Sequence, residues 1–432
     1  MALLLPTSTS GALSRLHDGT LAPAGRWRHD LAALASFAGP TCIASVAYLD
    51  PGNFATNIAA GARYGYRLLW VVLLANLGAM LFQALSAKLG IARRQSLAQL
   101  CRAELPPLVA GAMWIVSEIG AMATELAELL GASIGLALLL GVPLLLGTIV
   151  TGALSWIILL LEPRRFRLIE MIIVALIASI GVCYIVETVL AHPDWRAIAY
   201  HSVVPWLDGR DGVILASGIV GATVMPHAIF LHSSLTRNRL PMADAAAGLR
   251  LVRASNIDVG LALTVVGLAN MAILYVSAAV FSGAPQGAAG IETAYRTLGP
   301  IFGGMSAAIF MTALLASGLS SSVVGTLAGQ RIMQDFIGWQ IPLWLRRLVT
   351  MAPAVAIVAW GVDATQTLVM SQVVLSLVLP VPLLALVVFT SRRSIMGPFV
   401  NGPGTRIAAI AGTLVILALN ILLVLDTFGV PL

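Results

Sequence analysis

The chain has 432 residues, of which 59% are hydrophobic and only 10% are charged, and its formal net charge is +6. A soluble domain is typically about 45–50% apolar and about 25% charged, so this composition excludes an ordinary water-soluble protein. Apolar stretches of about 18 residues or more recur along the chain, and each is long enough to cross a membrane as a helix. Because these stretches do not alternate with period two, they also exclude a membrane β-barrel.

Eleven apolar stretches predict an all-α polytopic membrane protein with eleven transmembrane helices. In chain order they lie near residues 31–60, 68–90, 107–137, 142–161, 166–191, 212–236, 256–282, 300–334, 345–361, 364–390 and 404–428. Short connections predict that residues 31–432 form a single transmembrane domain. Residues 1–30 have no signal-peptide pattern and are expected to be a disordered cytoplasmic tail.

The distribution of Lys and Arg predicts the orientation in the membrane. With the N-terminus in the cytoplasm, 20 of the 25 basic residues lie in or beside cytoplasmic segments. This excess places the C-terminus on the outer side of a bacterial-type inner membrane. The basic residues are divided among separate loops, so we expect no nucleic-acid partner.

The first predicted span contains the sequence "LDPGNFATN", which places Asp50, Pro51, Gly52 and Asn53 among apolar residues. Proline removes a backbone hydrogen bond and glycine loosens the helix, so the helix is predicted to unwind here. Unwound backbone inside a membrane is tolerated only where protein buries it or where it lines a cavity, and a carboxylate at such a place is usually functional. The alternative is a simple proline kink, with Asp50 paired to an arginine near the membrane surface.

The sixth predicted span contains a second break, in "GATVMPHAIF". Pro51 and Pro226 each lie in the first span of a block of five spans, in the segments 31–191 and 212–390. Because five is an odd number, the two blocks must have opposite orientations. Broken helices at corresponding places in two inverted repeats predict a transporter whose site lies between spans one and six.

The side chains at the two breaks indicate a metal site. Asp50 and Asn53 offer hard oxygen ligands, and Met225 offers a soft thioether. Oxygen ligands alone would suit Mg²⁺, Ca²⁺ or Na⁺, whereas a sulfur ligand favours a softer ion such as Mn²⁺ or Fe²⁺. We therefore expect the metal as a transported substrate and no resident cofactor.

Three segments carry a family resemblance: "GPTCIASVAYLDPGNFATNIAAGARYGYRLLW", "GATVMPHAIFLHSSL" and "LLASGLSSSVVGTLAGQRIMQDF". From about residue 38 to residue 395 the chain resembles the Nramp family of proton-coupled divalent metal transporters. The resemblance implies a LeuT-type fold with helices 1 and 6 broken around the metal. The metal ligands that it implies are Asp50, Asn53, Met225, the carbonyls of Ala47 and Ala222, and, in some conformations, Gln372.

The third span contains three acids, Glu118, Glu125 and Glu128. At about 100° per residue, Glu118 and Glu125 lie within about 20° of each other, with Glu128 about 60° further round. Such a stripe of carboxylates in a membrane helix is typical of a proton relay, although a structural network neutralised by arginines is the alternative.

Histidines and arginines extend the candidate proton pathway. His227 and His232 lie near the second break, where an imidazole could titrate near physiological pH or serve as a third metal ligand. The family resemblance implies that an acid at Glu125 and an arginine of span nine, Arg346 or Arg347, belong to the proton route. Arg347 is the expected partner. Many relatives have Asp in place of Glu125, so the number of protons per metal ion stays open.

Three further polar residues, Asn76, Thr223 and Asn270, match family positions near the pathway, although each alone would suit an interhelical hydrogen bond. The rival function is a sodium- or proton-coupled symporter of a small organic substrate on the same fold, but Asp50 would repel a substrate carboxylate. A membrane protease is disfavoured, because no second aspartate is placed to pair with Asp50 and no HExxH motif occurs. We expect divalent metal ions and protons as substrates, the lipid bilayer as surroundings, and no obligate protein partner.

Overall fold

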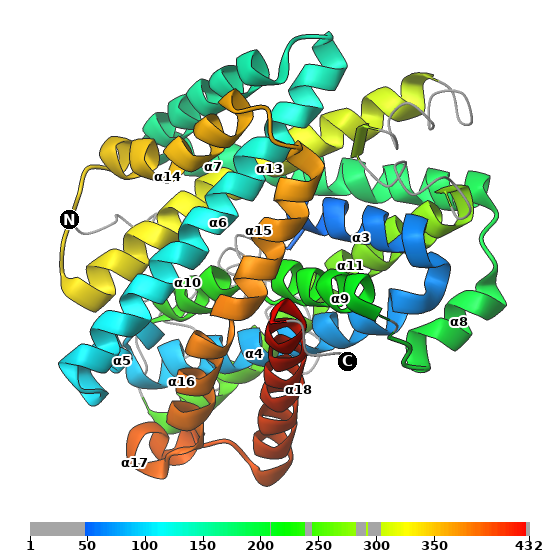
Figure 1. The fold of residues 1–432 in the computed structure, drawn as a ribbon. Coiled ribbons are helices and arrows are strands. Elements are labelled where there is room, and N and C mark those ends of the chain that lie inside the picture. Colours follow the sequence, from blue (N-terminus) through cyan, green and yellow to red (C-terminus); the bar gives the residue numbers. More distant parts are fainter. Residues whose placement is uncertain (1–47, 208, 238–243, 282–290, 293–303, 429–432) are drawn as a thin grey trace, which may run out of the picture.

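The computed structural model describes residues 48–207, 209–237, 244–281, 291–292 and 304–428, and this part of the chain is almost entirely helical (Figure 1). The α-helices are α3 (Pro51–Tyr64), α4 (Leu69–Arg93), α5 (Leu97–Glu104), α6 (Pro107–Leu140), α7 (Leu144–Ala191), α8 (Trp195–Val203), α9 (Gly209–Thr223), α10 (Pro226–Thr236), α11 (Ala245–Phe281), α13 (Gly304–Ile337), α14 (Leu343–Ala359), α15 (Ala364–Val378), α16 (Pro380–Ser391), α17 (Arg393–Met396) and α18 (Pro403–Thr427). Two 3₁₀ turns, η2 (Gly65–Leu68) and η4 (Gly397–Phe399), lie between them.

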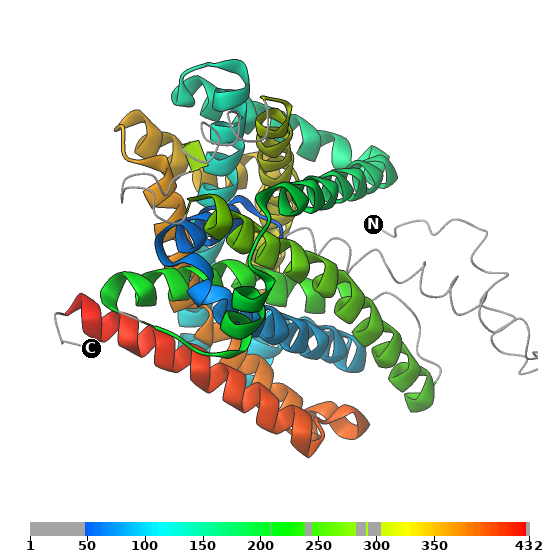
Figure 2. The ribbon, with the colours of Figure 1, turned by 90° about the vertical axis from the view of Figure 1, so that its right-hand side faces the viewer.

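Within the described residues, seven helical segments are long and apolar enough to cross a membrane. This confirms a polytopic helical membrane protein, while the count of eleven spans stays a prediction. Large apolar side chains are exposed on the outer faces of the peripheral helices, where lipid replaces water. Helix α18 is one of these and runs along the edge of the molecule (Figure 2).

Both predicted helix breaks occur at their proline residues. Asp50 has an extended backbone (φ −92°, ψ 163°) and caps α3, which begins at Pro51. Met225 is extended in the same way (φ −75°, ψ 123°), and α10 begins at Pro226. Proline is favoured at the first position of a helix because its missing N–H has no helical partner there. The half of the first span that precedes residue 48 lies outside the described residues.

One expectation for the other spans differs from the structure. The predicted spans 142–161 and 166–191 are joined in α7, a single helix of 48 residues, so the predicted break between them is wrong. The break was predicted from a short charged gap between two apolar stretches, but Glu and Arg are good helix formers, so such a gap does not by itself end a helix. The predicted span 364–390 agrees with the structure, in which Ala364–Ser391 is one apolar segment long enough to cross a membrane, with α15 and α16 separated only at Leu379.

Helices approach one another closely where a glycine faces a neighbouring helix. A Cβ atom at Gly221 of α9 would lie 2.0 Å from the carbonyl oxygen of Gln372 in α15. A Cβ atom at Gly131 of α6 would lie 2.0 Å from Cβ of Pro51 in α3. Small residues permit such contacts between membrane helices. These contacts hold α6, α9 and α15 against the start of α3, where the chain is broken (Figure 1).

Gly135→Ala should lower the melting temperature of the detergent-purified protein. The added methyl group would lie 2.9 Å from the amide nitrogen of Leu315 and 3.0 Å from the carbonyl oxygen of Met311, both in α13. Overpacking typically destabilises a protein by about 1–3 kcal/mol. Gly111→Ala is the control on the same helix, since its methyl group meets no neighbouring atom within 4 Å. Equal melting temperatures for the two variants would contradict the close α6–α13 contact.

Candidate metal site and proton pathway

The two helix breaks are joined by the side chain of Asn53. Its Nδ2 atom donates to Oδ1 of Asp50 at 2.8 Å, to the Tyr48 carbonyl at 3.1 Å and to the Ala222 carbonyl at 3.1 Å. Its Oδ1 atom accepts a hydrogen bond from the Thr223 hydroxyl at 3.1 Å. One amide therefore connects residues of α3, of the segment before it and of the end of α9, far from any exposed surface.

The Asp50 carboxylate is held by groups of its own break. It accepts hydrogen bonds from the backbone N–H groups of Gly52 at 3.2 Å and Asn53 at 2.9 Å, besides the Asn53 amide. The side chain is 1% exposed, and no arginine of the described chain pairs with it. The described structure therefore gives no support to the alternative of a simple kink with Asp50 paired to an arginine.

Met225 and Gln372 complete the described part of the predicted ligand set. Met225 is fully buried in the extended segment between α9 and α10. Gln372 lies against the first break, since a Cβ atom at Gly52 would be 2.2 Å from its Nε2 atom. Nε2 donates to the Ser371 hydroxyl at 3.1 Å, while the buried Oε1 has no hydrogen-bond partner in the described structure. Ala47, the remaining predicted ligand, lies outside the described residues.

The two histidines lie against other helices. Nδ1 of His227 is 3.1 Å from the Thr124 hydroxyl in α6. Nδ1 of His232 is 2.7 Å from Oε1 of Gln83 in α4. Each histidine thus uses Nδ1 toward a neighbouring helix, and the role of a third metal ligand stays a prediction.

A polar chain that sequence reasoning missed connects His232 to the first break. Gln83, which holds His232, donates from Nε2 to the Tyr48 hydroxyl at 2.5 Å. The Tyr48 carbonyl in turn accepts from Asn53 at 3.1 Å and from Asn270 at 3.2 Å. The sequence feature that could have identified Gln83 is its uncharged amide within the second apolar span. Such an amide more often marks an ordinary interhelical hydrogen bond, so it does not by itself predict a polar chain.

Of the three predicted polar residues, two lie at the breaks and one does not. Thr223 and Asn270 make the hydrogen bonds to Asn53 and Tyr48 that are described above. Asn76 in α4 instead donates to the Leu263 carbonyl in α11 at 3.3 Å and lies against Gly267. The geometry of Asn76 is thus that of an interhelical hydrogen bond.

The acids of α6 face two arginines of α14. Glu118 pairs with Arg346 at 2.7 Å, and Glu125 pairs with Arg347 at 3.4 Å. Both arginines are nearly inaccessible, with side-chain exposures of 2% and 1%. Buried charges are tolerated when they are paired and hydrogen-bonded, and these two pairs have the form of a neutralised network.

The pair of Glu125 and Arg347 is extended by polar residues of α13. The Thr326 hydroxyl donates to Oε1 of Glu125. Arg347 donates to the Ser322 carbonyl at 3.2 Å and to the Ser322 hydroxyl at 2.5 Å. Sequence reasoning placed neither α13 residue beside this ion pair, because hydroxyls in an apolar helix commonly serve close packing.

Glu128 differs from the other two acids. Its side chain is 1% exposed, and its Oε2 atom has no hydrogen-bond partner in the described structure. It lies against Gly325 of α13, where an added Cβ atom would be 2.7 Å from Oε2. Since α6 also contacts Pro51 at Gly131, one turn beyond Glu128, this acid is the one of the three closest along α6 to the first break.

This combination of two broken helices, joined by buried polar groups and set in a helical membrane domain, defines a membrane transporter with its site at the breaks. A family model described as "Natural resistance-associated macrophage protein-like", Nramp, matches residues 41–426. The chain belongs to the Nramp family.

Two curated relatives cover almost the whole chain. The divalent metal cation transporter MntH of Acidiphilium cryptum is 56% identical over 409 residues, which are 94% of each chain. The protein of the same name from Granulibacter bethesdensis is 51% identical over 425 residues, which are 98% of this chain and 95% of that one. The chain is therefore similar to full-length transporters and not to one part of them.

Solved structures agree with this assignment. One is the Eremococcus coleocola manganese transporter in complex with an aromatic bis-isothiourea substituted compound, which superposes with a TM-score of 0.82 at 32% identity. The alignment covers 93% of this chain and 88% of that chain. Mhp1, a nucleobase-cation-symport-1 family transporter, superposes with a TM-score of 0.61 at 12% identity. The alignment covers 89% of this chain and 88% of that chain, and at this identity it shows only that the fold is shared. The chain has the LeuT-type fold, and its relatives are transporters and not enzymes.

Arg347→Met should lower the melting temperature strongly, because it leaves the Glu125 carboxylate buried without its cation. Loss of one partner of a buried pair typically costs about 3–5 kcal/mol. Adding Glu125→Gln should recover part of the loss, since no uncompensated charge then remains. A double-mutant cycle on melting temperatures in detergent measures this coupling. Strictly additive effects would show that the two side chains do not stabilise each other.

Proposed function

We propose that this protein imports divalent transition metals, Mn²⁺ first and Fe²⁺ next, together with protons and by alternating access. The observation that carries the proposal is the meeting of the two helix breaks, where Asp50, Asn53 and Met225 are all buried. The names of the relatives, divalent metal cation transporters and a manganese transporter, support the same substrate class. The distribution of Lys and Arg supports an inner-membrane orientation with a cytoplasmic N-terminus and an outer C-terminus.

The site suits a cation once one amide turns. At present Nδ2 of Asn53 donates to oxygens of Asp50, Tyr48 and Ala222, three acceptors that a cation would also attract. Rotation of the amide would present Oδ1 in place of Nδ2 and release those oxygens. With the Gln372 oxygen and the Met225 sulfur, the ligand set is hard oxygen with one soft atom. Such a set discriminates against Mg²⁺ and Ca²⁺, which prefer oxygen ligands alone.

The acids of α6 support coupling to protons. Glu128, Glu125 and Glu118 are three and seven residues apart, so they are spaced by about 4.5 Å and about 10.5 Å along the helix axis. They lead away from the first break toward the two arginines of α14. We infer that Asp50 accepts a proton at the site and that the acids pass protons along α6, so that an acidic exterior drives uptake.

A symporter of a small organic substrate is the less favoured function. Its relatives at high identity would have to be organic-solute transporters, whereas those found are named for divalent metal cations. Asp50 would also repel a carboxylate substrate.

Met225→Ala should reduce the preference for Mn²⁺ over Mg²⁺ by about tenfold, which corresponds to about 1.4 kcal/mol of differential binding. Competition uptake into proteoliposomes, with Mn²⁺ as the reporter and Mg²⁺ as the competitor, measures this ratio. Met396→Ala is the matched control, since this methionine is buried as deeply in α17, away from the breaks. If Met225→Ala discriminates as the wild type does, the sulfur is not a ligand.

Asp50→Asn should abolish both Mn²⁺ uptake and the proton flow that accompanies it. The variant keeps the volume of the side chain but loses the charge that binds the metal and accepts the proton. Uptake of Mn²⁺ and internal acidification, read with a pH-sensitive dye, should both increase when the exterior of wild-type proteoliposomes is made acidic. Asp194→Asn is the control, because either residue can cap α8 at the surface. Proton-coupled uptake that persists in Asp50→Asn would refute the role of this carboxylate.

A further inference from the structure

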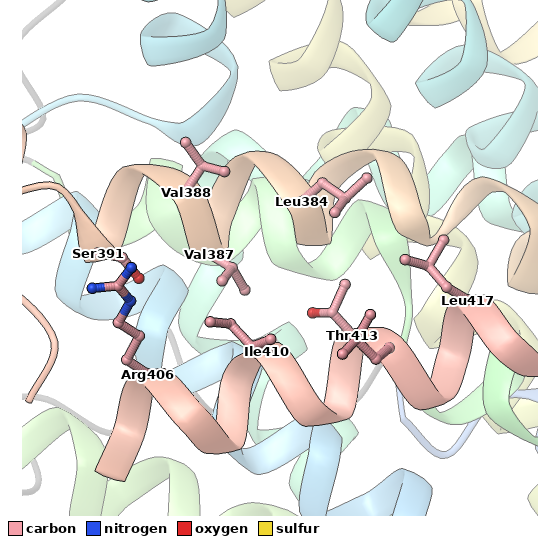
Figure 3. A pocket seen from close by; sticks show the side chains of 9 residues that line it. Leu384, Val387, Val388, Ser391, Arg406, Ile410, Thr413 and Leu417 are labelled. Atoms are coloured by element: carbon pink, nitrogen blue, oxygen red, sulfur yellow. The ribbon is translucent and has the colours of Figure 1, made fainter. Parts of the chain in front are cut away.

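A groove lies between α16 and α18 on the outside of the membrane domain, with a volume of about 240 Å³ (Figure 3). Its walls are apolar and are formed by Leu384 and Val388 of α16 and by Ile410 and Leu414 of α18. These four side chains are between 40% and 59% exposed, so no part of the described chain covers them. In a membrane this groove faces hydrocarbon.

One end of the groove is polar and positively charged. Arg406 and Ser391 lie together at this end, while the labelled side chains along the rest of the groove are apolar except for the hydroxyl of Thr413 (Figure 3). The Arg406 side chain makes no hydrogen bond or ion pair with any described residue, and the buried Ser391 hydroxyl also has no hydrogen-bond partner there. The groove therefore ends in one unpaired cation and one unused donor.

The surrounding sequence adds positive charge and no negative charge. Arg392 and Arg393 follow Ser391 directly and are exposed. No Asp or Glu occurs between residues 364 and 425. Neither this segment nor the described contacts of Arg406 supply a counter-ion, and an anion from outside the chain would complement the positive charge.

The length of the groove matches one leaflet of a bilayer. From Arg406 to Leu417 the groove follows 11 residues of α18, or about 17 Å at about 1.5 Å per residue. Half of a hydrocarbon core of about 30 Å is about 15 Å. A charged group held at Arg406 could therefore carry an acyl chain along the groove to the middle of the membrane.

We propose that the groove is a binding site for an anionic phospholipid. The Arg406 guanidinium and the Ser391 hydroxyl donate to the phosphate, and one acyl chain lies between the apolar walls of α16 and α18. A zwitterionic lipid would bring a second cation toward Arg392 and Arg393. A second copy of this chain docked through the same groove would bring its own arginines to this end, and like charges would oppose that contact.

The test uses phosphatidylglycerol with a photoreactive diazirine on its acyl chain, added to the full chain in phosphatidylcholine nanodiscs. Peptide mass spectrometry should locate the cross-links on α16 and α18. Arg406→Gln should lower their yield about fivefold, the effect expected from one basic side chain near a membrane surface. Arg253→Gln is the control, because this arginine is exposed on α11, outside the groove, and should leave the yield unchanged.

A second variant tests the acyl-chain part of the site. Leu414→Trp should lower the cross-link yield by filling the groove, and its side chain is exposed enough (59%) that the fold should tolerate the change. Melting temperatures of all variants report folding separately. Equal yields from a photoreactive phosphatidylcholine, an unchanged yield in Arg406→Gln, or cross-links between two copies of the chain would each overturn the proposal. None of these outcomes bears on metal transport.

Discussion

Backbone groups that leave a helix inside a membrane must find hydrogen-bond partners within the protein, and most of this structure follows from that requirement. Here the two breaks supply partners for each other through one side chain, Asn53, which contacts oxygens on both sides. Glycines in α6 and α9 let neighbouring helices approach the breaks closely enough to exclude lipid. The polar groups that satisfy the broken backbone are also the groups that can bind a cation.

Because the same polar groups satisfy the broken backbone and can bind a cation, metal binding and structural change can be linked. At the proposed site, a cation that enters between the breaks would replace the Asn53 amide nitrogen as the partner of the Asp50 carboxylate and the Ala222 carbonyl. The contact between α3 and the end of α9 would then depend on whether metal is present. A ligand shifts a conformational equilibrium only through contacts that differ between the states, and this exchange of partners is such a difference.

The sequence was sufficient for the parts of the molecule that follow from local chemistry. Pro51 and Pro226 predicted where helices begin, because proline acts on its own backbone. The length of a helix was harder to predict than its start, since α7 continues through the predicted break between spans four and five. The bridge from Asn53 and the chain through Gln83 were not predictable, because they depend on which helices lie side by side.

The most direct test of a metal site built from both breaks is X-ray absorption spectroscopy of the purified protein loaded with Mn²⁺. The ligand shell should contain oxygen together with one sulfur atom, and the sulfur should disappear in Met225→Ala while the oxygen ligands stay. A shell of oxygen alone in the wild type, or a sulfur signal that persists in Met225→Ala, would show that the ion is not held between the two breaks as we propose.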